Sequence, residues 1–150
     1  MYVDPYRLAA RFLGLKEAPG AVHNPAIVAM LDLCEPGPHG DEVPWCSAFV
    51  SYCCWLLGVS RSQSLRARSW LTVGAPIGLA EARPGYDVVV LARGDNAPRA
   101  DVIAAPGHVG FFAGWDRQKQ TVRVLGGNQG DKVSIAEFPS ARVLGVRRLS

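Results

Sequence analysis

The sequence predicts a single α+β domain in which helices come first and an antiparallel β-sheet follows. Before Pro84 the chain contains helix start signals and apolar stretches of helical length. After Gly85 it changes to short runs rich in β-branched residues, divided by Gly, Asn and Asp. Helices followed by strands favour an antiparallel sheet over a doubly wound one, in which the two alternate. A chain of 150 residues, 49% of them hydrophobic, is long enough for one core and short for two ordinary domains.

Each expected helix is bounded by its own start and stop residues. Asp4 and Asn24 are capping residues that stand directly before a proline, a combination typical of helix starts. Glycines follow three of the four apolar stretches, at Gly14, Gly58 and Gly74, as expected at helix ends. The four expected helices cover residues 6–13, 25–33, 46–57 and 65–73.

The expected strands cover residues 86–92, 108–113, 121–126, 133–138 and 142–149. We expect the second and third of them to form a hairpin in which Phe112 faces Val124. This register also places Gly110 opposite Gly126. Two paired glycines leave room for a helix to approach the sheet closely.

Cys46 is the expected nucleophile. It begins the apolar stretch 46–57 directly after Val43-Pro44, so its sulfur is expected in the first turn of a buried helix. Unpaired N–H groups and the positive end of the helix dipole favour thiolate at that position. A buried cysteine is more often a packing residue, which is our interpretation of Cys53 and Cys54 in the middle of the same helix. All four cysteines are expected to be free thiols, since their placing does not suit a disulfide framework.

His108 and Asn128 are the expected partners of this cysteine. The hairpin register places them opposite each other on one face, with Cβ atoms about 5 Å apart. Cysteine on a helix, then histidine, then an amide is the chain order of papain-like thiol hydrolases. We therefore expect His108 to act as base and then as acid, and Asn128 to fix the imidazole tautomer. Asn128 has a second interpretation as a turn residue, because Gly-Gly-Asn-Gln-Gly is also good turn chemistry.

No metal and no cofactor is expected. Cys34, His39 and Cys46 lack the paired spacing of zinc ligands. Asp41 and Glu42 stand just before the cysteine helix and either cap it or belong to a calcium loop whose other ligands are missing. A thiol hydrolase needs neither ion for its chemistry.

The formal net charge of +3 makes the chain mildly basic. Its one local excess, Arg142 with Arg147 and Arg148, suits an anionic polymer but is more simply a solvated face. We expect no nucleic-acid binding, because no signature of it occurs. Membrane insertion is not expected either, since no apolar run approaches the roughly 20 residues of a span. Asp4 and Arg7 stand where a signal peptide would have its apolar core, so synthesis without a signal is expected.

Four blocks of sequence resemble those of a known family. They are Pro44-Trp45-Cys46-Ser47-Ala48-Phe49-Val50, Ala67-Arg68-Ser69-Trp70-Leu71, Gly107-His108-Val109-Gly110-Phe111 and Leu125-Gly126-Gly127-Asn128-Gln129. Together they resemble a phage- and prophage-associated branch of the CHAP and NlpC/P60 peptidoglycan hydrolases. The resemblance implies a papain-like fold and matches Cys46 and His108 to the nucleophile and the base of that family. The chain departs from many CHAP domains at Gly126, where a glutamate would precede the asparagine by two residues.

Residues close to these matched positions are expected to bind substrate. They are Trp45, Ser47, Trp70, Gly107, Gly127 and Gln129. The partner that the resemblance implies is bacterial peptidoglycan, cleaved at a peptide or amide bond through a thioacyl-enzyme. Which bond is cut stays open at the level of sequence.

We expect a monomer that is made in the cytoplasm, and the resemblance implies that it acts on the cell wall, as a phage lysis protein or a virion-associated one. A separate wall-binding module is not expected within residues 1–150. Two alternatives remain at this point. One is an amidase or acyltransferase for a different amide, because the same three residues serve both reactions. The other is a non-catalytic structural or binding module of a phage particle, which would have no chemical need for Cys46 and His108.

Overall fold

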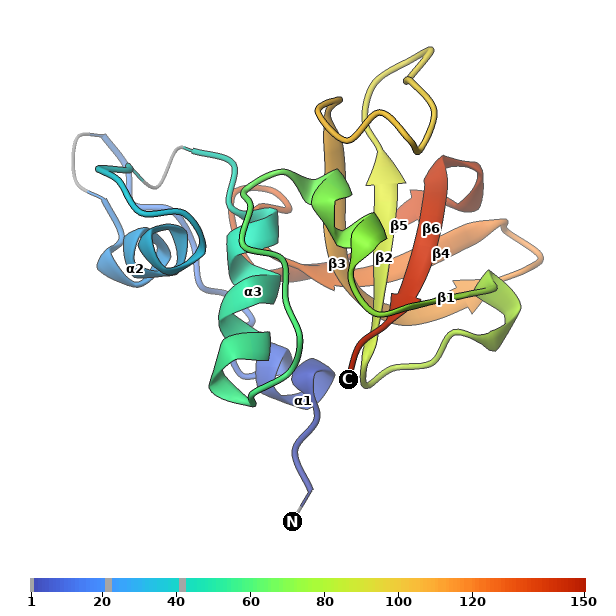
Figure 1. The fold of residues 1–150 in the computed structure, drawn as a ribbon, viewed down its shortest axis with the longest axis horizontal. Helices are drawn as coiled ribbons and strands as arrows, with labels where there is room; N and C mark the ends of the chain where they lie inside the picture. Colours follow the sequence, from blue (N-terminus) through green and yellow to red (C-terminus); the bar gives the residue numbers. More distant parts are fainter. Residues whose placement is uncertain (1, 21–22, 41–42) are drawn as a thin grey trace.

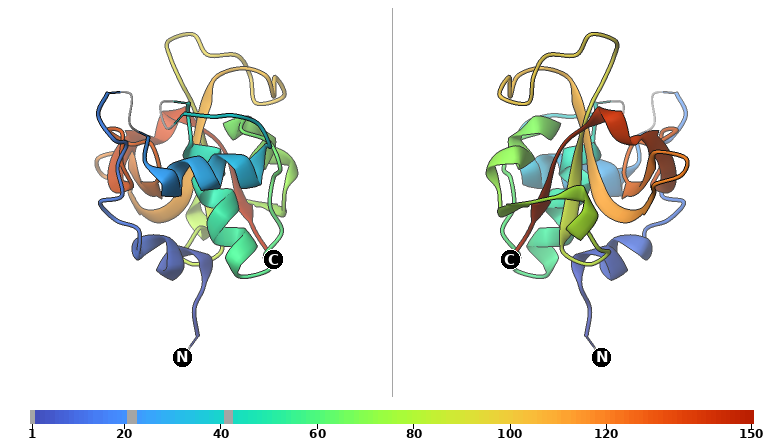
Figure 2. Two further views of the ribbon diagram at one scale, coloured as in Figure 1. Left: turned by 90° about the vertical axis from the view of Figure 1, so that its left-hand side faces the viewer. Right: turned by 90° about the vertical axis from the view of Figure 1, so that its right-hand side faces the viewer.

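Three α-helices pack on one side of a six-stranded antiparallel sheet in this computed structural model, which describes residues 2–20, 23–40 and 43–150 (Figure 1). The helices are α1 (Pro5–Ala10), α2 (Pro25–Cys34) and α3 (Cys46–Leu56), and the 3-10 helices are η1 (Ala67–Thr72), η2 (Leu79–Glu81) and η3 (Ser140–Arg142). The strands are β1 (Ala75–Ile77), β2 (Asp87–Ala92), β3 (Gly107–Asp116), β4 (Thr121–Gly126), β5 (Ser134–Pro139) and β6 (Val143–Arg148). Their order in the sheet is β1-β6-β2-β3-β4-β5. Seen from the helical side in Figure 2, the three helices stand in front of the strands.

The predicted α+β class with helices before strands is confirmed, and β4 has the predicted bounds. Two predicted helices differ from the structure. The first ends at Ala10 and continues as turns to Gly14, whereas the stretch near residues 65–73 forms only the 3-10 helix η1. Strand β1 was not predicted. This strand contains Pro76, which cannot donate a ladder hydrogen bond. The proline is tolerated because β1 lies at the edge of the sheet.

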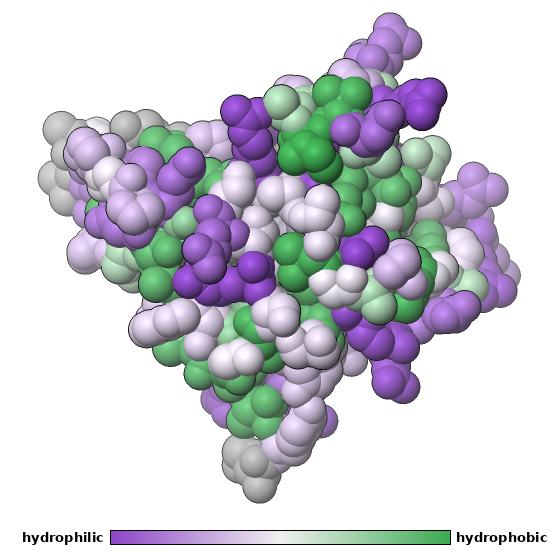
Figure 3. Space-filling view, in the orientation of Figure 1, coloured by the Kyte–Doolittle hydropathy of each residue, from purple (hydrophilic) through white to green (hydrophobic). Residues whose placement is uncertain are grey.

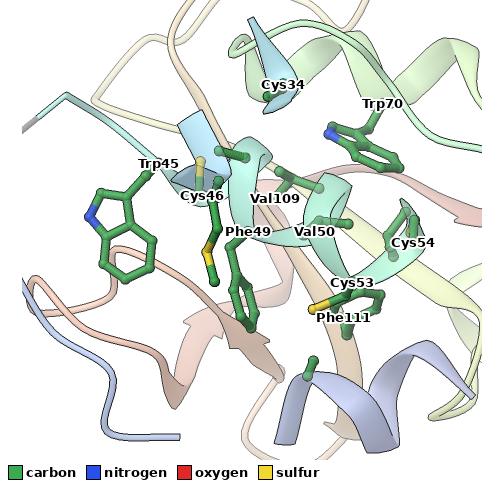
Figure 4. Packing of buried hydrophobic residues seen from close by; sticks show 14 of the residues in the cluster. Cys34, Trp45, Cys46, Phe49, Val50, Cys53, Cys54, Trp70, Val109 and Phe111 are labelled. Carbon is green, nitrogen blue, oxygen red and sulfur yellow. The ribbon is translucent and has the colours of Figure 1, made fainter. Parts of the chain in front are cut away.

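Helix α3 lies at the centre of the main core. Its first six residues, Cys46 to Ser51, are all buried, as are Cys53 and Cys54. Figure 4 shows Phe49 and Val50 on this helix packed near Val109 and Phe111 of β3. The helix is therefore held against the strand that carries His108.

A second, smaller core lies on the other face of the sheet, because successive strand residues point to opposite faces. It is formed by Val89, Leu91, Phe112, Val122, Val124 and Val146, with Phe138 packed against it. Leu91 pairs with His108 in the register between β2 and β3. The start of β3 therefore places His108 beside this second core.

Backbone hydrogen bonds link residues 14–17 to the turn that follows β4. Gly14 donates a backbone hydrogen bond to the carbonyl of Val133, and Val133 donates one to the carbonyl of Leu15. Glu17 donates its backbone N–H to the carbonyl of Asp131, while its side chain accepts a hydrogen bond from the Trp45 indole at 2.8 Å. The turn and the start of α3 are thereby tied to the same short segment.

Trp45 and Phe49 of the α3 region pack closely against Gly127, the residue that follows β4. A Cβ atom at this position would lie 2.6 Å from the Trp45 ring and 2.8 Å from the Cβ of Phe49. The paired glycines of the predicted hairpin do not have this role, because a Cβ at Gly110 would meet neighbouring residues of β4. The expectation that Gly110 and Gly126 make room for the helix is therefore wrong, and Gly127 provides the space.

We expect Gly127→Ala to lower the free energy of unfolding by about 1–3 kcal/mol, because the added methyl group overfills a packed contact. Urea denaturation followed by circular dichroism measures the change. Gly78→Ala is the matched control, since a Cβ there would have only Glu81 within 4 Å, at 3.9 Å, and the backbone φ of −75° suits alanine. A Gly127→Ala protein as stable as the Gly78→Ala control would contradict the described packing of α3.

None of the helices in the described ranges is long and apolar enough to cross a membrane. Figure 3 shows hydrophobic and polar residues interspersed over the face seen in Figure 1. Large exposed hydrophobic side chains include Tyr2, which precedes α1, Trp55 of α3 and Ile135 of β5.

Candidate active site

Cys46 is the first residue of α3, and its thiol lies against the first residues of β3. Trp45 is the N-cap residue of the helix and makes no side-chain capping bond, so the N–H groups of the first turn are not taken by a cap. The His108 ring and the backbone N–H groups of Val109 and Ser47 are the groups that stabilise a thiolate at Cys46. Only 3% of the residue is exposed.

The environment of Cys46 favours the thiolate. Burial opposes ionisation, but the hydrogen bond and the positive charge of His108, followed by the N–H groups of Val109 and Ser47, lower the pKa of Cys46 below its ordinary value. The other thiols behave in the opposite way. Burial raises the pKa of Cys34, and it raises that of Cys54 to about 12. Cys46 is thus chemically distinct from the packing cysteines.

The pKa of His108 is shifted in the opposite direction to that of Cys46. Burial by itself lowers the pKa of an imidazole, and this residue is only 7% exposed. The hydrogen bond to Cys46, the negative charge of that thiolate and the hydrogen bond to Gln129 outweigh burial and raise the pKa of His108. The lowered thiol pKa and the raised imidazole pKa both shift the pair towards a thiolate and an imidazolium.

Gln129 holds the other side of the imidazole. Its Oε1 lies 2.8 Å from His108 Nε2. Its Nε2 donates to the carbonyl oxygen of Val124 at 3.1 Å and to that of Ser134 at 2.8 Å, so the orientation of the amide is fixed. His108 Nε2 must therefore carry the proton and donate it to Gln129. The other ring nitrogen, Nδ1, is left to face Cys46.

The predicted role of Asn128 is corrected by this geometry. The register of Phe112 with Val124 is confirmed, but β4 ends at Gly126, so Asn128 has no place in the ladder with His108. Asn128 adopts a left-handed backbone conformation, with φ of 59°, and the chain turns there. The turn brings Gln129 to the imidazole instead. Gln129 was expected to bind substrate, and the described geometry gives it the orienting position.

Gly126 leaves the space in which Gln129 and His108 meet. A Cβ atom at Gly126 would lie 2.6 Å from Gln129 Oε1 and 3.3 Å from His108 Nε2. A larger residue at Gly126 would displace the amide oxygen from the ring. A glutamate at position 126 is therefore incompatible with this arrangement of Gln129.

Three of the expected substrate-binding residues are fully buried. Trp45, Ser47 and Trp70 each have 0% exposure. The Trp45 indole donates to Glu17, the Trp70 indole donates to the Ser47 hydroxyl at 2.8 Å, and that hydroxyl donates to the Ser64 carbonyl at 2.6 Å. The substrate-binding expectation is wrong for these side chains, because each is enclosed and has an internal partner.

The two glycines that were expected to bind substrate, Gly107 and Gly127, also have packing roles. Gly127 is buried beneath Trp45, whereas a Cβ atom at Gly107 would meet Arg68 Cγ at 3.0 Å and the Leu91 carbonyl at 3.1 Å. Gly107 directly precedes His108. Because it has no side chain, Arg68 of η1 and the backbone of β2 can lie close to the chain at this point. Nothing in the described contacts makes either glycine a substrate ligand.

A pocket of about 450 Å³ opens beside His108. We call it the His108 pocket, and its lining residues are Leu91, Ala92, Arg93, His108, Asn128, Gln129, Gly130, Ser134, Ala136, Phe138 and Arg142. The His108 ring lies 5.4 Å from the Phe138 ring, measured between centroids. Cys46 does not line the pocket, so the pocket lies on the imidazole side of the pair.

Arg68, which lies in one of the matched blocks, is buried near the site and has a role that the sequence did not predict. It is 0% exposed, its Nε donates to the carbonyl of Pro106 at 3.0 Å, and its Nη1 donates to the carbonyls of Pro98 and Arg99. These bonds fix the end of the long loop that leads into His108. Arginines are rarely fully buried, so composition gave no reason to place this one inside.

No group of three or more potential metal ligands occurs among the residues that the structure describes. His39 instead hydrogen-bonds the backbone carbonyl of Glu35 at 2.7 Å. Asp41 and Glu42 lie outside the described residues, so their expected part in a helix cap or a calcium loop stays a prediction.

No protein-family model and no curated protein sequence matches the chain. Among solved structures, the chain is similar to NlpC1 from Trichomonas vaginalis, with 15% sequence identity and a TM-score of 0.55. The match covers 100% of this chain and 46% of NlpC1, so the chain spans about half the length of that structure. At this identity the likeness shows the fold, which is α+β and papain-like, of the NlpC/P60 type. The phage-associated branch stays a prediction from sequence.

We expect Gln129→Ala to lower kcat by about tenfold to a hundredfold, because the imidazole loses the bond that fixes its tautomer while the base itself remains. Asn128→Ala should keep kcat within about twofold, since the described hydrogen bond of the imidazole goes to Gln129 and not to Asn128. Initial rates of amide hydrolysis, with each variant's melting temperature as the control for folding, measure both effects. Equal losses in the two variants, or a larger loss in Asn128→Ala, would contradict the assignment of Gln129.

Proposed function

We propose that the chain is a cysteine-dependent hydrolase that cleaves peptide or amide bonds of bacterial peptidoglycan. The observation that carries the proposal is the buried Cys46–His108–Gln129 arrangement at the junction of α3 and β3. Within it, the pKa of the Cys46 thiol is lowered and the pKa of the His108 imidazole is raised. These are the shifts expected of an activated nucleophile paired with an acid. The NlpC/P60-type fold supports the choice of substrate class.

In the proposed mechanism, the Cys46 thiolate attacks the carbonyl carbon of the scissile amide and forms a tetrahedral intermediate. The His108 imidazolium gives its Nδ1 proton to the leaving nitrogen, so the C–N bond breaks and an amine departs. A thioester remains on Cys46. Neutral His108 then accepts a proton from water, which attacks the thioester, and the collapse of the second intermediate releases a carboxylic acid and restores the thiolate.

Gln129 holds the ring through both halves of this cycle. Its Oε1 accepts a hydrogen bond from His108 Nε2–H whether the imidazole is neutral or protonated. Nδ1 is therefore always the ring nitrogen that gives or takes a proton in the reaction. A neutral amide fixes the tautomer without adding negative charge beside the imidazole. This is the role that the sequence assigned to an amide at the neighbouring position.

Digestion of purified murein, followed by mass spectrometry of the released fragments, tests the proposal. We expect soluble fragments with one new amino group and one new carboxyl group at a single type of bond. Cys46→Ala is the control and should release none. Fragments cut in the glycan strand, or equal release by Cys46→Ala, would overturn the proposal.

A different amide substrate is the remaining alternative, because the same residues catalyse any thiol-dependent acyl transfer. An intact Cys46 with a lowered pKa that nonetheless leaves murein uncut would favour that alternative. A non-catalytic module gains no support from an activated thiol.

A further inference from the structure

The 3-10 helix η1 contacts both elements that carry the Cys46–His108 pair. It contains the matched block Ala67-Arg68-Ser69-Trp70-Leu71, whose tryptophan is buried and therefore closed to substrate. Arg68 and Trp70 are two residues apart, and each is hydrogen-bonded to a different part of the site. One short turn of chain thus connects the start of α3 with the start of β3.

Trp70 holds the first turn of α3 through Ser47, the residue that follows Cys46. The Trp70 indole N–H donates to the Ser47 hydroxyl at 2.8 Å, and this hydroxyl donates to the carbonyl oxygen of Ser64 at 2.6 Å. The side chains of Trp70 and Ser47 are fully buried, and Figure 4 shows Trp70 beside α3. A shift of the first turn would break a buried hydrogen bond, which costs free energy.

Arg68 holds the chain that leads into β3. Its Nε donates to the carbonyl oxygen of Pro106, two residues before His108, at 3.0 Å. Its Nη1 donates to the carbonyl oxygens of Pro98 and Arg99, at 3.0 Å and 2.6 Å. One guanidinium group therefore ties two points of the preceding loop together and fixes the start of β3 relative to η1.

The guanidinium of Arg68 is buried at a cost in free energy. It is 0% exposed, its Nη2 has no hydrogen-bond partner, and no carboxylate pairs with it among the residues that the structure describes. An apolar side chain could fill the same space without that cost. Arginine alone provides a planar group that donates to several carbonyl oxygens in fixed directions. These contacts indicate a role in geometry rather than in stability.

We propose that Arg68 and Trp70 are positioning residues that together set the spacing between Cys46 and His108. The proposal rests on the proposed function, because it assigns both residues to the same reaction. Each of them acts through another part of the chain. Trp70 acts through Ser47, and Arg68 acts through the loop that leads into β3.

The same contacts position the two backbone N–H groups that favour the thiolate. These N–H groups belong to Ser47 and Val109. Trp70 holds the first residue by its side chain, and Arg68 holds the chain that precedes the second. Hydrogen bonds and an opposite charge lower a thiol pKa only at short range. Loss of either contact should therefore raise the pKa of Cys46.

The pH dependence of Cys46 alkylation by iodoacetamide, measured in folded variants, tests the proposal. Trp70→Phe keeps a buried ring and removes the indole donor. Arg68→Met fills the space and removes the guanidinium, whereas Arg68→Lys removes the planar fork and keeps the positive charge. In each variant we expect the alkylation midpoint to rise by about 0.5–1 pH unit. The His108 titration, followed by NMR, should move to lower pH because the two groups are coupled.

A purely structural role would lower the melting temperature without moving these titrations. Arg148→Lys and Trp115→Phe are the matched controls. The first weakens a structural ion pair with Asp87, and the second removes a buried indole N–H that has no hydrogen-bond partner among the described residues. Both should leave the alkylation midpoint of Cys46 unchanged. Sucrose, which favours folded states, keeps an unstable variant folded during the titration.

A Cys46 midpoint in Trp70→Phe, or in both Arg68 variants, that equals the midpoint of the controls would overturn the proposal. None of these measurements requires hydrolysis, so its failure is distinguishable from failure of the proposed function. Shifted midpoints in a protein that leaves murein uncut would support the positioning role and contradict the proposed function. Murein hydrolysis with unshifted midpoints would do the reverse.

Discussion

Replacing Cys46 with alanine is expected to lower murein hydrolysis by about three orders of magnitude or more, because the reaction loses the atom that forms the thioester. The loss should fall on kcat, since the nucleophile is buried and contributes little surface to substrate binding. Initial rates of fragment release measure the effect. Circular dichroism and melting temperature should show a folded protein, because removal of one sulfur leaves α3 packed.

Cys54→Ala is the matched control for this variant. Cys54 lies in the same helix and is equally enclosed, but burial raises the pKa of its thiol to about 12. We expect the control to retain kcat even if it is somewhat less stable. Hydrolysis by Cys46→Ala at a rate near that of the Cys54→Ala control would contradict the proposed mechanism.

Replacing His108 with alanine is expected to lower kcat by about 10²- to 10⁴-fold, the usual contribution of a positioned acid and base. The variant loses the group that protonates the leaving amine and also the main influence that lowers the pKa of Cys46. Both losses act on the chemical step. Steady-state rates on murein fragments of defined sequence separate this effect on kcat from any change in KM.

His39→Ala is the control for His108, because the His39 ring is hydrogen-bonded to the Glu35 carbonyl and has no described bond to Cys46 or Gln129. It should retain activity within about threefold. A His108→Ala protein that keeps wild-type kcat would show that another group performs the proton transfers.

Much of the fold could be predicted from local signals. The Asp4-Pro5 and Asn24-Pro25 starts are used as helix caps, and the Asp4 and Asn24 side chains accept the expected backbone hydrogen bonds. Alternation of β-branched residues located five of the strands. The edge strand β1 was missed because three residues with a proline carry too little pattern to distinguish a strand from a loop.

The proposed nucleophile and base could be picked out from the sequence for a physical reason. A helix start preceding an apolar stretch and a histidine at the start of a strand are both local features, and the structure brings Cys46 and His108 into contact. For the residue that orients the imidazole, the prediction was wrong by one position: the sequence indicated Asn128, and the structure places Gln129 there. Gly-Gly-Asn-Gln-Gly permits the strand to end anywhere within it, so the register known at Phe112 and Val124 could not be extended to Asn128.

The roles of the tryptophans could not be deduced from their blocks. Trp45 and Trp70 stand beside matched residues, and aromatic side chains near a nucleophile often bind substrate. Their indole N–H groups instead find Glu17 and Ser47, partners that only the tertiary structure brings within 2.8 Å. Long-range partners of this kind are not encoded in local spacing.

The central claim, that Cys46 is an activated thiolate paired with His108, is tested most directly by the pH dependence of alkylation at each cysteine. The native protein is treated with iodoacetamide across a pH series, and labelling of the four thiols is quantified separately by mass spectrometry. Because the pKa of Cys46 is lowered, it should react at pH values where Cys34, Cys53 and Cys54 do not, and its titration should move to higher pH in His108→Ala. A Cys46 that titrates as an ordinary thiol in both proteins would contradict the account.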